Sequence, residues 1–168
     1  MLISVAELLK HDNSEEKISL DMDLSSFSFS PMSVHFAEPL KVVGKMKHAG
    51  GVIMLEAEAE GNYTCVCDRC GVDTTHSIKF SVSENFVRAA TVFQEDEDAV
   101  RFEGYEIDLA QTVSEFAFSA LPTKHLCKED CKGLCQKCGK DLNEGPCTCP
   151  TKELNPAFAK ILSMFDNE

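Results

Sequence analysis

The residues best suited to chemistry in this chain are its nine cysteines, eight of which fall into two groups. The C-terminal group reads Cys135-Gln-Lys-Cys138-Gly139 and then, after a polar spacer, Cys147-Thr-Cys149. A C-x-x-C-G turn brings two thiolates to one side of a tight loop, and its glycine relieves the backbone strain. Since four thiolates satisfy tetrahedral Zn²⁺, we expect a structural zinc site with Cys135, Cys138, Cys147 and Cys149 as ligands.

The second group is divided between two parts of the sequence. Cys67-Asp-Arg-Cys70-Gly71 repeats the C-x-x-C-G pattern, and Cys127 and Cys131 are its natural partners because they otherwise lack a role. These four cysteines predict a second zinc site. Two alternatives stay open at this point. The group is a reducible dithiol, or one of its cysteines replaces Cys149 in the first site.

Other cysteine chemistries fit the pattern less well. An iron–sulfur cluster also takes four thiolates, but the glycine after each C-x-x-C pair favours zinc. A thioredoxin-like dithiol would need a flanking βαβ pattern, which the sequence lacks. An odd number of cysteines also argues against complete disulfide pairing. Cys65, two residues before Cys67 on the same expected strand, is predicted to be a core residue.

The charge distribution limits how this chain can contact nucleic acid. Its formal net charge of −12 opposes non-specific RNA binding, which depends on neutralising phosphates. Residues 122–152 are the exception, with six lysines against four carboxylates. The lysines predicted to face RNA or a partner protein are Lys124, Lys128, Lys132, Lys137 and Lys140. For a basic partner, the outward row of Glu56, Glu58 and Glu60 is the candidate contact.

The strands that must position the first cysteine pair follow from the hydrophobic pattern. Gly50-Gly51 between two alternating runs predicts a β-hairpin over 40–60, because paired glycines take the positive φ angles of a tight turn. The second strand of this hairpin is expected to continue toward Cys67. Alternation over 78–83 predicts another half-buried strand after the cysteine turn.

Two helices are predicted downstream. Asp108 and Gln111 form a capping-box pattern for a helix that ends at Pro122 and carries an apolar stripe of Leu109, Val113, Phe116 and Ala120. Asn155 and Pro156 begin a short amphipathic helix that must dock on its own domain or on a partner. The acidic run at 94–98 is expected to be a solvated loop.

These elements predict an α+β fold: a largely antiparallel β-sheet or small barrel with a packed helix and a C-terminal cysteine-rich zinc module. We divide the chain into an α+β core at 1–121 and a zinc module with a docking helix at 122–168, which together form one structural unit. There is no apolar run long enough to span a membrane and no pattern of a signal peptide at the N-terminus. We therefore expect a cytoplasmic protein.

An enzymatic role is not expected. The five histidines lie apart in the sequence, and no nucleophile elbow, phosphate-binding glycine loop or deaminase-type H-x-E motif is present. A zinc ion held by four thiolates keeps no open coordination position, so it indicates a structural role rather than hydrolysis. The chain is interpreted as a non-enzyme.

In their combined order, these motifs resemble the bacterial YceD family, described as large ribosomal RNA subunit accumulation proteins. The matching stretches are Cys67-Asp-Arg-Cys70-Gly71, Glu106-Ile-Asp-Leu109, Ala120-Leu-Pro122, Cys131-Lys-Gly-Leu-Cys135-Gln-Lys-Cys138-Gly139-Lys-Asp-Leu-Asn143, Cys147-Thr-Cys149 and Asn155-Pro156. The resemblance covers residues 40–165, and the residues before it match only loosely.

The resemblance implies a role in the accumulation or processing of 23S ribosomal RNA and in large-subunit assembly. Together with the cysteine pattern, it predicts a non-catalytic, zinc-binding ribosome-biogenesis factor. Its expected partner is a ribosomal precursor particle or a basic ribosomal protein, with weak direct contact to 23S rRNA, no membrane and no small-molecule substrate. The alternative is a regulatory protein that senses thiols or metal through its C-x-x-C pairs.

Overall fold

The computed structural model describes residues 1–27, 29, 33–89 and 99–149 of the chain. Its elements, in chain order, are β1 (Leu2–Ser4), η1 (Leu8–Lys10), β2 (Ser14–Met22), β3 (Val34–His35), β4 (Leu40–Ala49), β5 (Val52–Val66), β6 (Asp73–Arg88), β7 (Val100–Phe102), β8 (Glu106–Asp108) and α1 (Leu109–Ala120). The predicted helix from Asn155 and the predicted loop at 94–98 lie outside the described residues.

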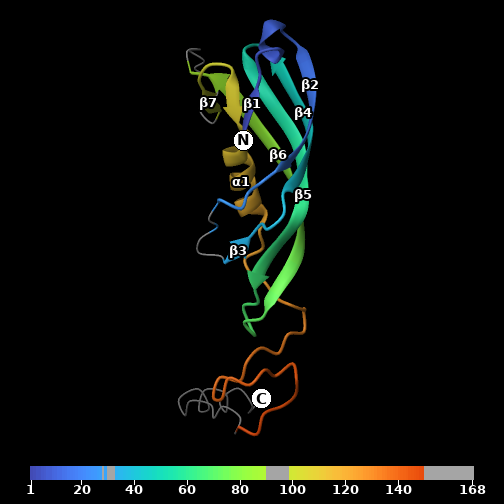
Figure 1. The fold of residues 1–168 in the computed structure, drawn as a ribbon, viewed down its shortest axis with the longest axis vertical. Helices are drawn as coiled ribbons and strands as arrows, with labels where there is room; N and C mark the ends of the chain where they lie inside the picture. The colour runs from blue at the N-terminus through green and yellow to red at the C-terminus, as the bar shows by residue number, and fades with distance from the viewer. Residues whose placement is uncertain (28, 30–32, 90–98, 150–168) are drawn as a thin grey trace, which may run out of the picture.

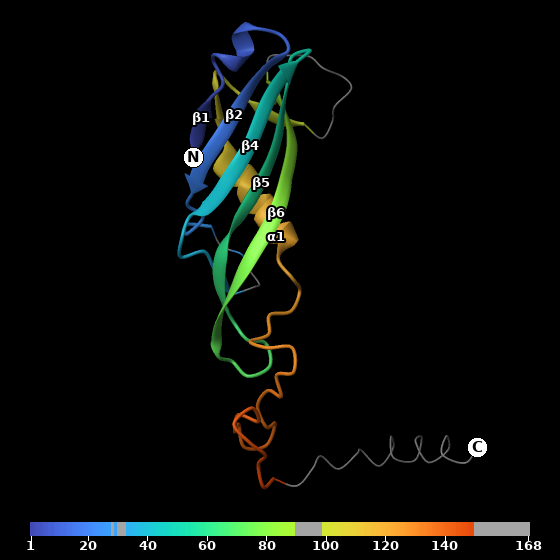
Figure 2. The ribbon, with the colours of Figure 1, turned by 90° about the vertical axis from the view of Figure 1, so that its right-hand side faces the viewer.

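Most strands form one sheet in the order β2-β4-β5-β6-β7, with β3 paired to β5. Every pair in this sheet is antiparallel except β6–β7, which is parallel. The predicted largely antiparallel sheet is therefore confirmed. The alternative of a small barrel is wrong, because in the described part of the chain β2 and β7 are opposite edges that do not pair. The helix α1 covers the face that a barrel would have enclosed (Figure 2).

The hairpin of β4 and β5 has the predicted turn and the predicted alternation. Gly50 and Gly51 take φ angles of 59° and 83°, which are unfavourable for residues with a side chain. Along β5, Leu55, Ala57 and Ala59 are buried, whereas the intervening glutamates are exposed. Each buried aliphatic side chain of this inner face contributes roughly 1–3 kcal/mol to stability.

The hairpin of β5 and β6 is longer than its neighbours. Its ladder runs from Val52↔Val87 to Val66↔Asp73, so its far turn extends beyond β4. Figure 1 shows this turn pointing at the cysteine-bearing segment below the sheet. The sheet therefore supplies a rigid arm for the first C-x-x-C pair.

The helix α1 begins and ends where the sequence predicts. The carboxylate of Asp108 caps it by accepting the N–H of Ala110 at 3.0 Å, although the Gln111 side chain donates to Glu115 at 2.6 Å instead of completing a capping box. Of the predicted stripe, Leu109 and Val113 are buried, Phe116 is half-buried and Ala120 is exposed; Ala117 is the buried residue of the last turn.

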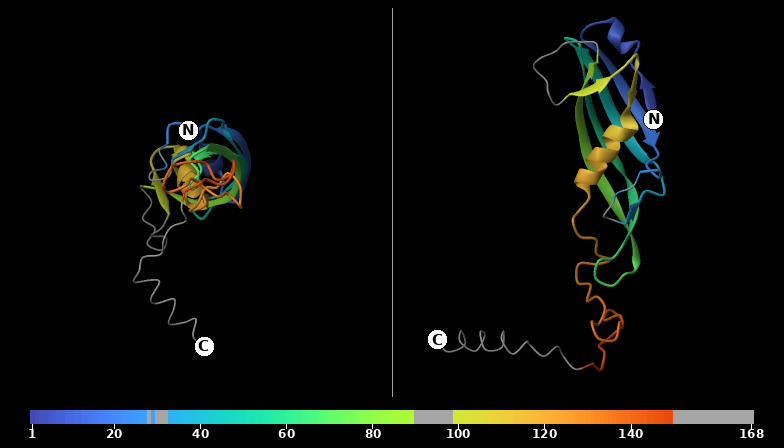
Figure 3. Two further views of the ribbon diagram at one scale, coloured as in Figure 1. Left: turned by 90° about the horizontal axis from the view of Figure 1, so that it is seen from below. Right: turned by 90° about the vertical axis from the view of Figure 1, so that its left-hand side faces the viewer.

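The path of the chain explains the role of this helix. It packs against β6 on the inner face of the sheet and then releases the chain beside the far turn of β5 and β6 (Figure 3). Among the described residues, no helix has the length and apolarity needed to cross a membrane. The division at residue 121 stays a prediction.

Candidate metal centres

The structure brings eight cysteines together in two groups of four, and both groups are those that the spacing predicts. We call Cys67, Cys70, Cys127 and Cys131 the inner centre, and Cys135, Cys138, Cys147 and Cys149 the outer centre. Within each centre, all four Sγ atoms lie within 4.8 Å of one another. A tetrahedron with Zn–S bonds of about 2.3 Å has S–S edges of about 3.8 Å, so both groups have the size of a tetrathiolate metal site.

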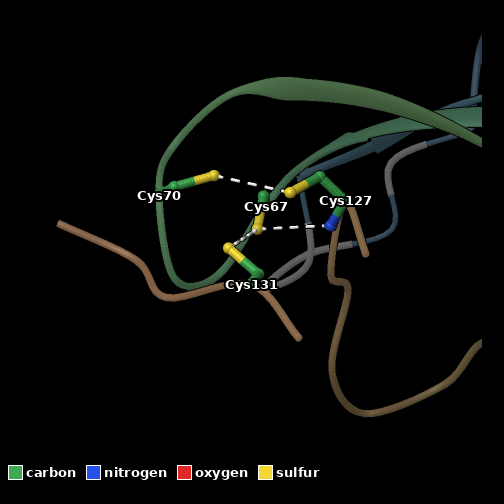
Figure 4. Close-up of side chains that lie close together, drawn as sticks. All are labelled: Cys67, Cys70, Cys127 and Cys131. Carbon is green, nitrogen blue, oxygen red and sulfur yellow. Dashed lines mark hydrogen bonds between the residues drawn. The ribbon is translucent and has the colours of Figure 1, made fainter. Parts of the chain in front are cut away.

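In the inner centre, each sulfur of the C-x-x-C pair faces a sulfur from the segment after α1 (Figure 4). The Sγ atoms of Cys67 and Cys131 are 3.9 Å apart, and those of Cys70 and Cys127 are 3.7 Å apart. The backbone N–H of Cys127 also donates to Cys67 Sγ at 3.4 Å. Three of these cysteines are buried and Cys127 is half-buried, so the centre is largely shielded from water.

The turn between β5 and β6 fixes the first pair. The N–H of Cys67 donates to the carbonyl of Val72 at 2.8 Å, and the N–H of Gly71 donates to the carbonyl of Cys67 at 2.9 Å. The first bond continues the ladder beyond its last register pair and the second closes the turn, so the sheet and its turn hold both ligands.

The second pair reaches the inner centre through hydrogen bonds to the same turn. The Asp68 N–H donates to the carbonyl of His125 at 2.8 Å, while the Asp68 carboxylate accepts the N–H of His125 at 2.6 Å. The guanidinium of Arg69 donates to the carbonyl of Cys131 at 2.7 Å. The two residues between the cysteines of the first knuckle therefore dock the segment that carries the other two ligands.

The outer centre is a local structure. Two backbone hydrogen bonds close its knuckle. The N–H of Gly139 donates to the carbonyl of Cys135 at 2.8 Å, and the N–H of Cys135 donates to the carbonyl of Lys140 at 2.9 Å. The Sγ atoms of Cys135 and Cys147 are 3.4 Å apart. Cys138 is exposed and the other three cysteines are half-buried, so solvent reaches this centre more easily than the inner one.

Gly133 lets the segment between the two centres pass close to Arg69. Its φ is 70°, and a Cβ on this residue would lie 2.8 Å from the carbonyl oxygen of Arg69. That carbonyl accepts the N–H of Leu134 at 3.1 Å. Only glycine meets both the backbone angle and the close approach.

Asn143 connects the two centres. Its amide nitrogen donates to Cys131 Sγ at 3.5 Å, and its Oδ1 accepts the N–H of Lys132 at 2.9 Å. Asp141 fixes the amide by accepting from it at 2.7 Å. Sequence reasoning did not assign this residue a role, although it stands in the Lys-Asp-Leu-Asn stretch after the outer knuckle.

Within each centre the thiols differ in how readily they lose a proton. Burial raises the pKa of Cys67, but backbone N–H groups, that of Cys127 first, outweigh it and bring the pKa to about 6. Backbone N–H groups, that of Cys138 first, lower the pKa of Cys135 to about 6. Burial and nearby thiols raise the pKa of Cys127 to about 12, and neighbouring thiols, Cys138 first, raise the pKa of Cys149 to about 12. A bound divalent cation would resolve this conflict, because it stabilises all four thiolates together.

The five predicted lysines surround the cysteine segment and are all exposed. They form no ion pair with another described residue, and Lys140 Nζ donates to the carbonyl of Pro146 at 3.1 Å. By contrast, two of the outward glutamates of β5 form ion pairs. Glu56 pairs with Lys45 at 3.2 Å and Glu58 with Lys79 at 2.8 Å, so lysines of both neighbouring strands offset their charge.

Two histidines that are far apart in the sequence, His76 and His125, lie close together in the fold, with ring centroids 6.4 Å apart. The ring centroids of His76 and His125 are each 5.6 Å from that of Tyr63, and His125 is only 5% exposed. These two histidines lie apart in the sequence but meet at Tyr63 in the fold. Cys65 belongs to the hydrophobic core, as predicted, and is not part of either centre.

Residues 55–164, which include both centres, match the sequence profile of a family described as "Large ribosomal RNA subunit accumulation protein YceD". The chain belongs to the YceD family. The match confirms the resemblance based on the cysteine motifs.

Curated relatives of the chain include an uncharacterized protein of Mycobacterium tuberculosis, which is 30% identical over 105 residues, or 61% of this chain and 50% of the relative. A second, from Mycobacterium leprae, is 31% identical over 102 residues, or 59% of this chain and 46% of the relative. A third relative, "Large ribosomal RNA subunit accumulation protein YCED homolog 1, chloroplastic" of Arabidopsis thaliana, is 30% identical over 67 residues, or 39% of this chain and 21% of the relative.

The matched region spans half the length or less of these curated relatives. No solved structure matches the fold.

Proposed function

We propose that this protein is a non-catalytic, zinc-binding ribosome-biogenesis factor that supports 23S rRNA accumulation and large-subunit assembly in the cytoplasm. The observation that carries the proposal is the pair of four-cysteine centres within the region that matches a ribosomal RNA accumulation family. The inner centre joins the sheet to the segment after α1, so its metal would stabilise the surface that this segment presents.

Zinc is the metal that the ligand set favours. Each centre supplies four thiolates, the donor that structural Zn²⁺ sites use, and S–S distances of 3.4–3.9 Å suit tetrahedral coordination. Four protein ligands leave no position for a substrate or an activated water. Stabilisation of the fold, rather than catalysis, is therefore the role assigned to the metal.

Metal analysis of the purified chain tests this assignment directly. We expect about two equivalents of zinc per chain, one for each closed tetrathiolate site. Replacement of one inner and one outer ligand, Cys131→Ser with Cys147→Ser, should bring the content close to zero, while Cys65→Ala should leave it unchanged. A stoichiometric iron signal, or less than about half an equivalent of zinc, would refute the zinc assignment.

The expected partner is a precursor of the large subunit or a basic ribosomal protein within it. A net charge of −12 opposes binding to naked RNA, and among the described residues the cysteine segment offers five exposed lysines for contact with phosphates. The paired lysines and glutamates of the sheet offer a face with both charges to a protein partner.

The cellular role can be tested in cells depleted of this protein. Depletion should lower the 23S rRNA level and the large-subunit peak in a sucrose gradient, and the wild-type chain should restore both. The Cys131→Ser variant should fail to restore them, whereas Cys65→Ala should succeed. Normal 23S rRNA in depleted cells would refute the role in the ribosome, and rescue by Cys131→Ser would refute the need for the inner metal.

A thiol- or metal-sensing role is the second candidate, and the exposure of Cys138 favours it for the outer centre only. The inner cysteines are the less suitable switch because three of them are buried. Thiol titration with and without a chelator distinguishes the two functions. A structural zinc protein reacts only after chelation, whereas a redox sensor forms disulfides reversibly without metal loss from the inner centre.

A further inference from the structure

A cavity bordered by basic side chains lies at the end of the sheet opposite the metal centres. It has a volume of about 570 Å³, within the range of ligand sites, and its lining includes Lys10, His48, Arg88 and Tyr105. Among the residues that the structure describes, no carboxylate lines it, although the chain has 28 acidic residues. The lining residue Gly51 belongs to the β4–β5 turn, which is at the opposite end of β5 from the inner centre (Figure 1).

Arg88 is the unusual side chain of this cavity. Its Nε and Nη2 are buried and have no hydrogen-bond partner among the described residues. Its Cζ lies 4.7 Å from the centre of the Tyr105 ring, so the guanidinium lies over an aromatic surface. A buried cationic group without a partner is unfavourable, and a bound anion would remove that cost.

The other basic side chains leave room for such an anion. Lys10 pairs with Glu7, but their side chains are 58% and 80% exposed. Because an ion pair this exposed to solvent is weak, Lys10 can exchange Glu7 for another anion. His48 directs Nδ1 at the carbonyl of His11, at 3.0 Å, which leaves Nε2 for another contact. One fixed guanidinium, one adaptable ammonium and one imidazole thus border the same space.

Tyr105 adds an aromatic surface to this basic site. The residue is 58% exposed although Arg88 covers part of its ring, so a planar group can still pack against it. Aromatic and guanidinium planes together are the means by which proteins hold unpaired nucleotides, with the base stacked and the phosphate bound by arginine.

We propose that this cavity, formed around Arg88, Tyr105, Lys10 and His48, binds a nucleotide, with the phosphate on Arg88 and Lys10 and the base against Tyr105. An acidic peptide would also satisfy the cations, but it would not use the exposed ring. The site is independent of the cysteine centres, and the proposal does not depend on a bound metal.

The test is a titration of the full chain, in its metal-bound form, followed by NMR. The sequence has three arginines, Arg69, Arg88 and Arg101, so their side-chain Nε–H signals can be assigned by single substitutions. The probes are a single-stranded pentaribonucleotide, uridine monophosphate, inorganic phosphate and a hexaglutamate peptide. We expect the Arg88 signal to shift with both nucleotides, whereas Arg69 and Arg101 should stay in place.

Three variants identify the groups involved. Arg88→Gln should weaken binding of the pentaribonucleotide at least tenfold, since it removes a charge-assisted, two-pronged contact, and Tyr105→Ala should weaken it about tenfold. Arg101→Gln removes an exposed arginine of the adjacent strand β7 that does not line the cavity, and it should bind as the wild type does. Zinc content and the amide spectrum show whether each variant is folded.

The outcomes are distinct. Tighter binding of the pentaribonucleotide than of uridine monophosphate would show that the site binds an RNA strand. Equal binding of the two would show that it binds a single nucleotide. Equal binding of inorganic phosphate, or stronger binding of hexaglutamate, would overturn the proposal. Unchanged binding by folded Tyr105→Ala together with folded Arg88→Gln would overturn it as well. None of these results bears on the ribosomal role of the metal centres.

Discussion

The inner and outer centres each consist of four cysteines, two of them in a C-x-x-C-G knuckle, yet the centres differ in the parts of the chain that they connect. The inner centre joins Cys67 and Cys70 to cysteines about 60 residues away in the chain, whereas the outer centre lies within residues 135–149. A metal that closes a long loop restricts the unfolded chain more than one that closes a short loop. The comparison indicates that one centre holds the tertiary fold together and the other shapes a single loop.

The largest expected effect comes from removing one ligand of the inner centre. Cys131→Ser should release the segment after α1 from the β5–β6 turn, because the metal and the contact to Asn143 are lost together. Cys147→Ser should disturb residues 135–149 alone. Hydrogen exchange should show lost protection at 66–73 and 122–134 in the first variant only. Equal loss in both variants would remove the distinction between the centres.

A chelator should remove metal from the two centres at different rates. The outer centre is more exposed, so we expect a strong chelator to remove its metal at least about tenfold faster than the inner metal. The strands of the sheet should keep their exchange protection after both metals are lost, because the hydrophobic core lies between the sheet and α1, away from the two metal centres. Zinc release followed with a colorimetric indicator would show two phases. A single phase would mean that the centres open as one unit.

A pair of glycines offers a smaller and more specific test. Gly133 and Gly139 have φ angles of 70° and 72°, but a Cβ meets the Arg69 carbonyl at 2.8 Å only at Gly133. Gly139→Ala should cost about 1–2 kcal/mol from the backbone angle, and Gly133→Ala about 3–4 kcal/mol because the clash adds to it. Denaturant unfolding of the metal-bound chains measures both. Equal costs would show that the segment moves away from Arg69 without penalty.

The smallest effect is expected at Asn143. Asn143→Ala leaves the N–H of Lys132 without its acceptor and removes one of the donors to Cys131 Sγ, at a cost of about 1–2 kcal/mol. The exposed Asn62 on β5 provides the control, since Asn62→Ala should change stability by less than about 0.5 kcal/mol. The variant should also speed zinc release from the inner centre. Release at the wild-type rate would show that Asn143 only orders the loop.

Local pattern was sufficient to predict much of this structure. The Gly50-Gly51 turn, the alternation along β5 and the Asp108 cap all depend on residues close in sequence. Cysteine spacing also predicted the membership of both groups, because eight thiols in this order have few sensible pairings. Whether the sheet would close was not decided locally, since it depends on which strands become its edges.

Contacts between distant residues were the part that sequence reasoning missed. Asn143 joins the two centres, His125 packs on Tyr63, and Arg88 lies over Tyr105, none of which follows from a motif. The charge of the sheet was also misjudged from one strand. Glu56 and Glu58 look acidic along β5, but their lysine partners come from β4 and β6.

The separation of the inner ligands along the chain has a consequence for synthesis. The first knuckle leaves the ribosome about 60 residues before its partners, which at 5–20 residues per second is on the order of 3–12 s. During that interval Cys67 and Cys70 form only half a site, and the strand β6 and the helix α1 have still to be made. Tight metal capture at the inner centre can therefore occur only after the sheet and its covering helix exist, so loading of this ion marks the completion of the nascent fold.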